Sequence, residues 1–268
     1  MDKSKQSELL DAIGVWIKAL DSYPGFREWQ RKKVGAVLSL VEGFPIRDDD
    51  LPGEFQFTAE INRQHEAILA YLSLAQSFYT LQQCEFYFRR YPFAHLPVSK
   101  EDHIRNMCEM YFNRFYEFKE RLKRCLNAVD ATIEGTINTG PVLKSFAKDF
   151  DQELRARNSI HHHERFDDGA IHGIGLALIM GYSDKVGPGW RDVANRGYRR
   201  SSAEWAARVK RRSKMVETYL EAVAGAMLDM CSYLQPEAAK ASVTPSVTRS
   251  AKSPAARAAK PVKKPKRS

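Results

Sequence analysis

A short segment in the second half of the chain carries the residue types that acid–base chemistry on a phosphate requires. From Leu154 to Arg165 it reads L-R-A-R-N-S-I-H-H-H-E-R. Arginine stays cationic and forks onto phosphate oxygens, whereas histidine titrates near neutrality and moves protons. RNA cleavage without a metal needs both, because one group takes the 2′-hydroxyl proton while another neutralises charge on the phosphate.

Within this segment, an arginine and a polar residue precede the histidine run. Four residues separate Arg157 from His162, five separate it from His163, and Asn158 follows the arginine. This pattern resembles the signature of the HEPN superfamily (higher eukaryotes and prokaryotes nucleotide-binding domains). That signature is an arginine, usually followed by a polar residue, with a histidine after four to six intervening residues.

The resemblance implies a fold, an activity and a set of roles. It implies an all-α bundle and a metal-independent endoribonuclease, of the toxin or phage-defence kind, that leaves a 2′,3′-cyclic phosphate in a cleft between two copies of the chain. The resemblance then makes His162 the general base or acid, Arg157 the residue that holds the phosphate, and Asn158 an orienting group. The partners implied are RNA and a second copy of the chain, with room for a cognate antitoxin or other protein. The resemblance implies neither a cofactor nor a metal.

The pairing of arginine with histidine is open in detail. The spacing from Arg155 to His161 also fits, although Ala156 follows that arginine where a polar residue is expected. A regular helix advances ~100° per residue, which puts His161 about 40° from Arg157 and His162 about 140° away. His162 therefore meets Arg157 only if the helix loosens or a second subunit completes the site. The accessory candidates are Arg155, His161 and His163.

Interpretations without catalysis stand beside this one. Arg157 has Asp151, Glu153 and Glu164 as alternative ion-pair partners, and the histidines suit a solvated helix end near the negative pole of the helix dipole. A metal site is disfavoured, because adjacent residues on a helix point ~100° apart, so the four side chains from His161 to Glu164 do not converge. A non-catalytic HEPN-like module that binds a nucleotide, nucleic acid or protein is the main alternative.

Amphipathic helices must position this segment. Apolar residues recur at three- and four-residue steps, and no alternating strand pattern appears. The predicted helices and turns are 7–21, 27–42, 58–90, 100–132, 141–163, 174–182, 190–197 and 202–234. We expect an all-α, HEPN-like bundle of long antiparallel helices. Residues 1–57 are expected to form a helical extension packing on the core, 58–234 the bundle, and 235–268 a disordered tail rich in Lys, Arg, Pro and Ala.

An aromatic series lies on the helix predicted at 100–132. Its members are Tyr111, Phe112, Phe115, Tyr116 and Phe118. Such rings stack on bases in single-stranded nucleic-acid sites, but at helical spacing they more often form a core. The core interpretation is preferred.

The positive charge is concentrated in the tail. Residues 235–268 hold nine basic residues and one acid, a balance of +8, which leaves +1 of the total +9 for residues 1–234. Basic tails bind nucleic acid loosely and with strong salt dependence, and a purely solubilising tail is the alternative. A second basic cluster opens the last predicted helix, where a solvated helix face is the alternative to nucleic-acid binding. The residues assigned to nucleic-acid binding are Arg199, Arg200, Arg208, Arg211, Arg212, Lys263, Lys264, Lys266 and Arg267.

The cysteines and the apolar runs bear on the compartment. Cys84, Cys108, Cys125 and Cys231 form no C-x-x-C pair, so we expect free buried thiols in a reducing compartment. No apolar run approaches the ~18 residues that span a bilayer. The polar start of the chain also lacks the apolar block of a secretory signal. These features predict a cytoplasmic protein without a membrane partner.

Overall fold

A computed structural model describes residues 3–41, 43, 53–92, 97–133, 136–182 and 189–235. These residues are mostly helical and include no strand, which confirms the prediction of an all-α fold. The tail predicted to be disordered lies outside the described residues, apart from Gln235 at its start. The helices are α1 (Lys5–Leu20), α2 (Phe26–Val41), α3 (Ala59–Arg89), α4 (Lys100–Asp130), α5 (Thr139–Asp149), α6 (Asp151–His162), α7 (Gly169–Gly181) and α8 (Trp190–Met230), followed by a 3-10 turn, η2 (Ser232–Leu234).

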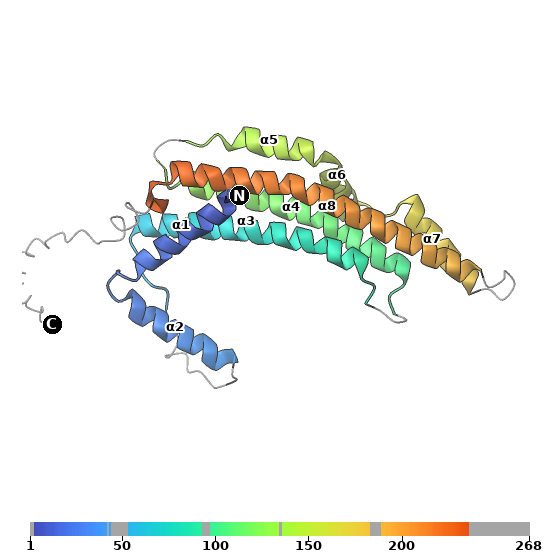
Figure 1. Cartoon of the computed structure of the whole chain (residues 1–268), viewed down its shortest axis with the longest axis horizontal. Helices are drawn as coiled ribbons and strands as arrows, with labels where there is room; N and C mark the ends of the chain where they lie inside the picture. Colours follow the sequence, from blue (N-terminus) through green and yellow to red (C-terminus); the bar gives the residue numbers. More distant parts are fainter. Residues whose placement is uncertain are drawn as a thin grey trace, which may run out of the picture.

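Three long helices, α3, α4 and α8, lie side by side and form the main body of the described chain (Figure 1). Their apolar residues recur at helical spacing and meet in one core. Hydroxyl side chains fix where two of them begin. The Thr58 hydroxyl accepts a hydrogen bond from the Ile61 N–H (3.3 Å), and the Ser99 hydroxyl accepts one from the Asp102 N–H (2.9 Å). Both helices lie within two residues of their predicted bounds.

The aromatic series on α4 is largely core. Tyr111, Phe112, Phe115 and Phe118 are buried, which confirms the preferred interpretation for these four residues. Tyr116 differs, because it points away from the core and is 37% exposed. Its ring contacts a side chain of α6 instead.

The end of the chain is more continuous than predicted. The turn expected at 190–197 and the helix expected at 202–234 are one helix, α8. Buried residues follow one another at helical spacing through the expected break. Gly197 lies against α7, where a β-carbon would stand 3.2 Å from Cγ1 of Ile174. This glycine therefore serves close packing between α7 and α8 and does not end a helix.

Helix α7 begins earlier than predicted. We expected a helix over 174–182, but α7 starts at Gly169 because Asp168 caps it. The Asp168 carboxylate accepts hydrogen bonds from the backbone N–H groups of Ala170 (3.0 Å) and Ile171 (2.8 Å). An aspartate in this position satisfies two N–H groups that have no partner inside the helix.

The first two helices differ in how they meet the rest of the chain. On α1, the Lys5 N–H donates to Oε2 of Glu221 on α8 (2.8 Å), and the buried Trp16 Nε1 donates to Oε1 of Gln64 on α3 (2.9 Å). Helix α2 projects away from the long helices (Figure 1). Contacts between aromatic rings join the N-terminal end of α2 to the neighbouring segments of the chain. The rings involved are Tyr23, Phe26, Trp29, Phe55 and Phe57.

All four cysteines are free and buried, as predicted. Burial raises the pKa of the Cys84 thiol to about 11 and that of the Cys125 thiol to about 12. At neutral pH these groups therefore stay protonated and pack as small apolar side chains. No described helix combines the length and the hydropathy needed to cross a bilayer.

Candidate functional site

The helix that carries the motif, α6, owes its direction to a break at Phe150. This residue alone separates α5 from α6, with φ −117° and ψ 25°. Its buried ring lies 5.0 Å from that of Phe115 on α4 and 4.6 Å from that of Phe146 on α5, measured between centroids. The prediction of one helix over 141–163 is therefore wrong. Packing of this ring turns the chain and lets α6 lie against α4.

Glu153, on the inner side of α6, is fully buried and joins α6 to α8. Its carboxylate accepts hydrogen bonds from Nε (3.0 Å) and Nη2 (2.5 Å) of Arg212 and from Nη2 of Arg208 (3.0 Å). The Tyr111 hydroxyl of α4 donates a further one (3.3 Å). We call Glu153, Arg208 and Arg212 the Glu153 clamp. It fixes the rotation of α6 about its own axis and so decides which residues of the motif face outward.

Electrostatics in the Glu153 clamp favour the ionised carboxylate. Burial by itself raises the pKa of Glu153, but the hydrogen bonds and charges of Arg212 and Arg208 outweigh burial and hold this pKa below its ordinary value. A buried carboxylate is tolerated here because it is paired and its lone pairs are occupied. Since two arginine charges meet one carboxylate, the clamp leaves a net positive charge beneath α6.

Arg157 stacks on Tyr116 of α4. The centre of its guanidinium lies 4.0 Å from the ring centroid, which is the distance of a cation–π contact. Nη1 donates to Oδ1 of the exposed Asn158 (3.3 Å). Nε is buried and has no hydrogen-bond acceptor among the described residues. The ring and the amide therefore hold this guanidinium in place while part of its hydrogen-bonding capacity stays unused.

The carboxylates considered as ion-pair partners of Arg157 are engaged elsewhere or too distant. Asp151 pairs with Arg155 (2.8 Å), and Glu153 belongs to its clamp. Glu164 is exposed and forms no ion pair with Arg157. Within the residues that the structure describes, no acid lies within ion-pair distance of Arg157. Its positive charge is therefore available to an anion from outside.

The three histidines end α6 in solvent. His161, His162 and His163 are exposed, and their rings lie 4.9 Å and 6.3 Å apart in consecutive pairs. Helix α6 stays regular through His162, so it does not loosen between Arg157 and that histidine. No hydrogen bond joins any of the three to Arg157 in the described part of the chain. One chain thus presents an anchored arginine and, separately, a run of exposed imidazoles.

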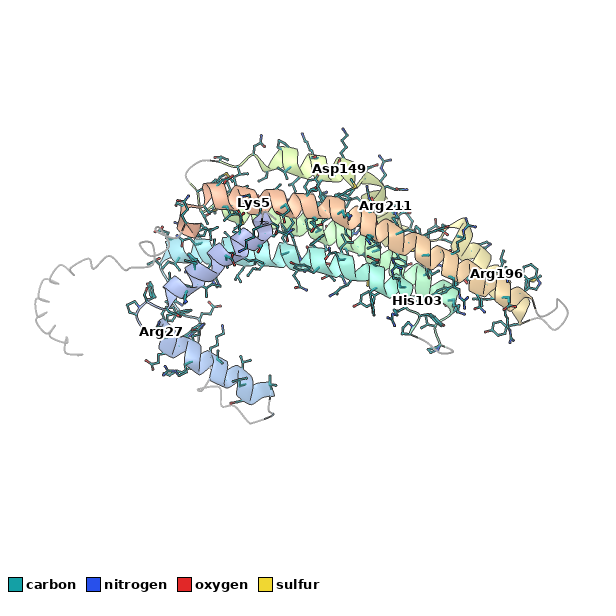
Figure 2. All side chains as sticks on the ribbon, viewed as in Figure 1. Lys5, Arg27, His103, Asp149, Arg196 and Arg211 are labelled. Carbon is teal, nitrogen blue, oxygen red and sulfur yellow. The ribbon has the colours of Figure 1, made fainter. Side chains whose placement is uncertain are left out.

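The basic residues predicted to bind nucleic acid divide into groups. On α8, Arg199, Arg200 and Arg211 are exposed, and Arg211 lies midway along the helix (Figure 2). Arg208 and Arg212 turn inward instead and belong to the Glu153 clamp. The four tail residues outside the described residues are Lys263, Lys264, Lys266 and Arg267.

Two parts of this site differ from the sequence prediction. The sequence predicts Glu153 only as a surface partner of Arg157, yet this residue follows the buried Phe146 and Phe150 at helical spacing. An acid in an apolar stripe, with basic residues in the apolar stripe of another helix, is the signal that indicates a buried pair. The contact of Arg157 with Tyr116 has no local signal, because it joins residues far apart in the chain.

A second titratable cluster lies where α4 and α8 meet, near α7 (Figure 2). The buried Nδ1 of His103 on α4 is hydrogen-bonded to the Tyr198 hydroxyl on α8 (3.0 Å), and the ring of Tyr91 stands edge-on to the imidazole at 5.4 Å. Nζ of Lys100 lies 5.9 Å from the centroids of both tyrosine rings. Burial lowers the pKa of His103 below its ordinary value of 6.5.

The lowered pKa of His103 predicts a contribution to stability that depends on pH. The unfolded chain protonates this histidine near pH 6.5 and the folded chain only at lower pH, so the contribution of His103 to the free energy of unfolding is fully present above pH 6.5 and is lost as the pH decreases. One such group contributes at most about 1.4 kcal/mol per pH unit. We expect His103→Gln to reduce the loss of stability between about pH 7.5 and about pH 5.5 in urea titrations.

The exposed His172 supplies the matched control, since it lies on α7 with 64% of its side chain in solvent. His172→Gln is expected to keep the pH dependence of the wild type. Equal losses of stability in the wild type and His103→Gln would show that the buried imidazole is not the group responsible.

Comparisons and metal geometry add no further site. Among the described residues, no three His, Cys, Asp or Glu side chains are grouped so that they hold a metal ion. Comparisons of the chain with protein-family models, with curated proteins and with solved structures found no match. The candidate site therefore rests on the residues and contacts of this chain.

Proposed function

We propose that the protein is a metal-independent endoribonuclease that cleaves RNA at the end of α6, in a cleft between two copies of the chain. The state of Arg157 carries this proposal. It is a cation without an acidic partner among the described residues, and it lies on α6, where three exposed imidazoles follow at the helix end. Tyr116 of α4 holds its guanidinium in place. A phosphodiester with a neighbouring 2′-hydroxyl is the substrate that suits such a pair of groups.

The fold is compatible with this function. A HEPN-like antiparallel bundle formed by residues 58–234 accommodates the long helices α3, α4 and α8, with α1 and α2 as an extension. The motif then occupies the end of a shorter helix packed on that bundle. A cytoplasmic toxin or phage-defence effector is the biological role that we attach to the proposal.

In the proposed reaction, His162 takes the proton of the 2′-hydroxyl, whose oxygen attacks the adjacent phosphorus. A bond forms between the 2′-oxygen and phosphorus while the bond from phosphorus to the 5′-oxygen breaks, and a protonated imidazole of the second motif gives its proton to the leaving oxygen. Arg157 balances the charge on the phosphate, and Asn158 holds the guanidinium. The products are a 2′,3′-cyclic phosphate and a 5′-hydroxyl.

Basic residues on α8 support RNA binding in this proposal. Arg199, Arg200 and Arg211 are exposed and suit phosphate contacts without base recognition. The Glu153 clamp adds net positive charge beneath the motif. Since phosphate contacts release counterions, RNA affinity is expected to fall steeply with salt.

A non-catalytic helical module that binds a nucleotide, nucleic acid or protein is the second candidate. The observation that favours it is the lack of a hydrogen bond between Arg157 and the histidines within the described residues of one chain. In that case the anchored arginine binds a phosphate and the imidazoles take no part in chemistry.

Incubation of the purified protein with RNA and with DNA of the same sequence, in EDTA, tests the proposal. We expect RNA to be cut to fragments with 2′,3′-cyclic phosphate ends and DNA to stay intact, because DNA lacks the attacking hydroxyl. Binding of RNA without cutting would favour the second candidate. Cutting that disappears only when metal is chelated would contradict a metal-independent reaction.

A further inference from the structure

The outer side of α3 is an exposed helix face that lacks charge along most of its length. No Lys, Arg, Asp or Glu occurs from residue 67 to residue 84. On this side of α3, four large apolar side chains expose between 41% and 55% of their surface, although solvated helix faces are normally charged. These side chains are Leu69, Tyr79, Phe86 and Tyr87.

The spacing on this side of α3 is that of a helix-pairing seam. Six positions, five of them exposed and one half-buried, follow one another at alternating steps of three and four residues, which is a period of 3.5. We call them the α3 seam. They are Leu69, Leu72, Gln76, Tyr79, Gln83 and Phe86.

Apart from Leu72, which is half-buried against the core, the described helices leave the α3 seam uncovered. Helices α4 and α8 pack on other sides of α3, where residues such as Leu74 and Leu81 are fully buried. Packing in the core therefore does not account for the 3.5-residue period of the α3 seam, because the core residues of α3 lie on its other sides. An isolated apolar side chain on a surface needs no explanation, but a row of them indicates an interface.

We infer that the α3 seam binds the α3 seam of a second copy of this chain. The pattern is self-complementary from Leu72 to Phe86. In an antiparallel pair with its two-fold axis near Tyr79, the two Tyr79 side chains meet, Gln76 lies opposite Gln83 and Leu72 lies opposite Phe86, so that amide faces amide and apolar side chain faces apolar side chain. Leu69 then lies opposite Arg89, at the edge of the contact. No like charges meet between residues 67 and 84, as an isologous contact requires.

The dimensions suit such a pairing. The seam runs from Leu69 to Phe86, about 26 Å along the helix axis. Three seam residues, Leu69, Tyr79 and Phe86, and the adjacent Tyr87 together expose on the order of 400 Å². This is about half of the roughly 800 Å² that a standard interface buries on each partner, and the glutamines and flanking residues are the source of the remainder. Aromatic residues, which are enriched in interface cores, supply three of the four.

Another exposed apolar helix fits a second copy less well. Helix α2 exposes Val34, Val37 and Leu38, but it also carries Arg27, Arg31, Lys32 and Lys33 against one acid, Glu28. Two copies of this helix laid against each other bring like charges together, which opposes association. It therefore provides a control surface of similar exposure.

The inference goes beyond the proposed function and does not depend on it. The motif lies on α6, which packs on α4, and α3 is not among the principal packing partners of α6. Pairing through the α3 seam is therefore a contact separate from the cleft proposed for RNA cleavage.

The mass of the full chain in solution, measured by light scattering, tests the inference. We expect the wild type to exceed 30.6 kDa by a whole multiple and Tyr79→Glu to halve the wild-type mass. Since Tyr79 lies at the two-fold axis, the carboxylates of the two copies would be buried against each other, which is expected to raise the dissociation constant at least about 100-fold. Because Tyr79 is 45% exposed, the variant is expected to keep the helical content of the wild type.

Leu38→Glu on α2 is the matched control, with an exposure of 55%. It is expected to keep the wild-type mass. A monomeric wild type, a Tyr79→Glu variant of unchanged mass, or dissociation in the α2 control would overturn the inference. RNA cleavage is followed on the same samples. An inactive wild type that Tyr79→Glu still dissociates would remove the proposed function and leave the seam intact.

Discussion

Replacing His162 by alanine is expected to lower the rate of RNA cleavage by about 10²- to 10⁴-fold, the usual contribution of a positioned general acid or base. The free energy of unfolding is expected to stay within about 0.5 kcal/mol of the wild type, because surface substitutions away from special features have small effects. The side chain is exposed and belongs to no hydrogen bond among the described residues. A loss of rate therefore reports chemistry. The rate is measured on one RNA in EDTA.

Neighbouring histidines provide the comparison for this substitution. His161→Ala and His163→Ala are expected to have smaller effects, and a larger effect of either would transfer the role to that residue. His172→Ala, on the separate helix α7, is expected to cleave like the wild type. If His162→Ala also cleaves at the wild-type rate, His162 is neither base nor acid.

Glu153→Ala is expected to lower the free energy of unfolding by about 3–5 kcal/mol, the cost of removing one member of a buried ion pair. The substitution leaves the inward-facing Arg208 and Arg212 without their carboxylate. Glu153→Gln keeps the shape and part of the hydrogen bonding, so we expect a loss of about 1–3 kcal/mol. Urea unfolding followed by circular dichroism measures both.

The exposed pair of Arg200 with Glu204 on α8 is the matched control for the Glu153 clamp. Glu204→Ala is expected to cost less than about 1 kcal/mol, because solvent screens surface pairs. A Glu153→Ala variant within about 1 kcal/mol of the wild type would mean that the clamp does not anchor α6.

Much of the helical organisation follows from local patterns. The spacing of apolar residues predicts α3 and α4 to within two residues, and the hydroxyl caps that the structure shows at Thr58 and Ser99 account for where these helices begin. The breaks were harder, because a break also depends on what lies against the chain. Phe150 continues the apolar spacing of α5, yet its packing on Phe115 ends that helix. Gly197 has the composition of a break, yet its packing on α7 keeps α8 continuous.

The candidate site was also predictable only in part. The sequence predicts the position of Arg157, Asn158 and His162 at the end of a helix. It does not predict the net charge around Arg157, because this charge depends on which acids reach that arginine. Asp151 is engaged by Arg155 one turn away, a local pair, whereas Glu153 is drawn to arginines on another helix.

The rate of RNA cleavage in EDTA by Arg157→Ala, compared with Arg155→Ala, tests the central claim most directly. Both arginines lie on α6, but Arg155 is paired with Asp151 and 80% exposed, whereas Arg157 has no acidic partner among the described residues and stacks on Tyr116. We predict a loss of about 10²- to 10³-fold for Arg157→Ala, the usual cost of removing a group that stabilises developing charge, and a much smaller loss for Arg155→Ala. Equal rates in the two variants would contradict the account.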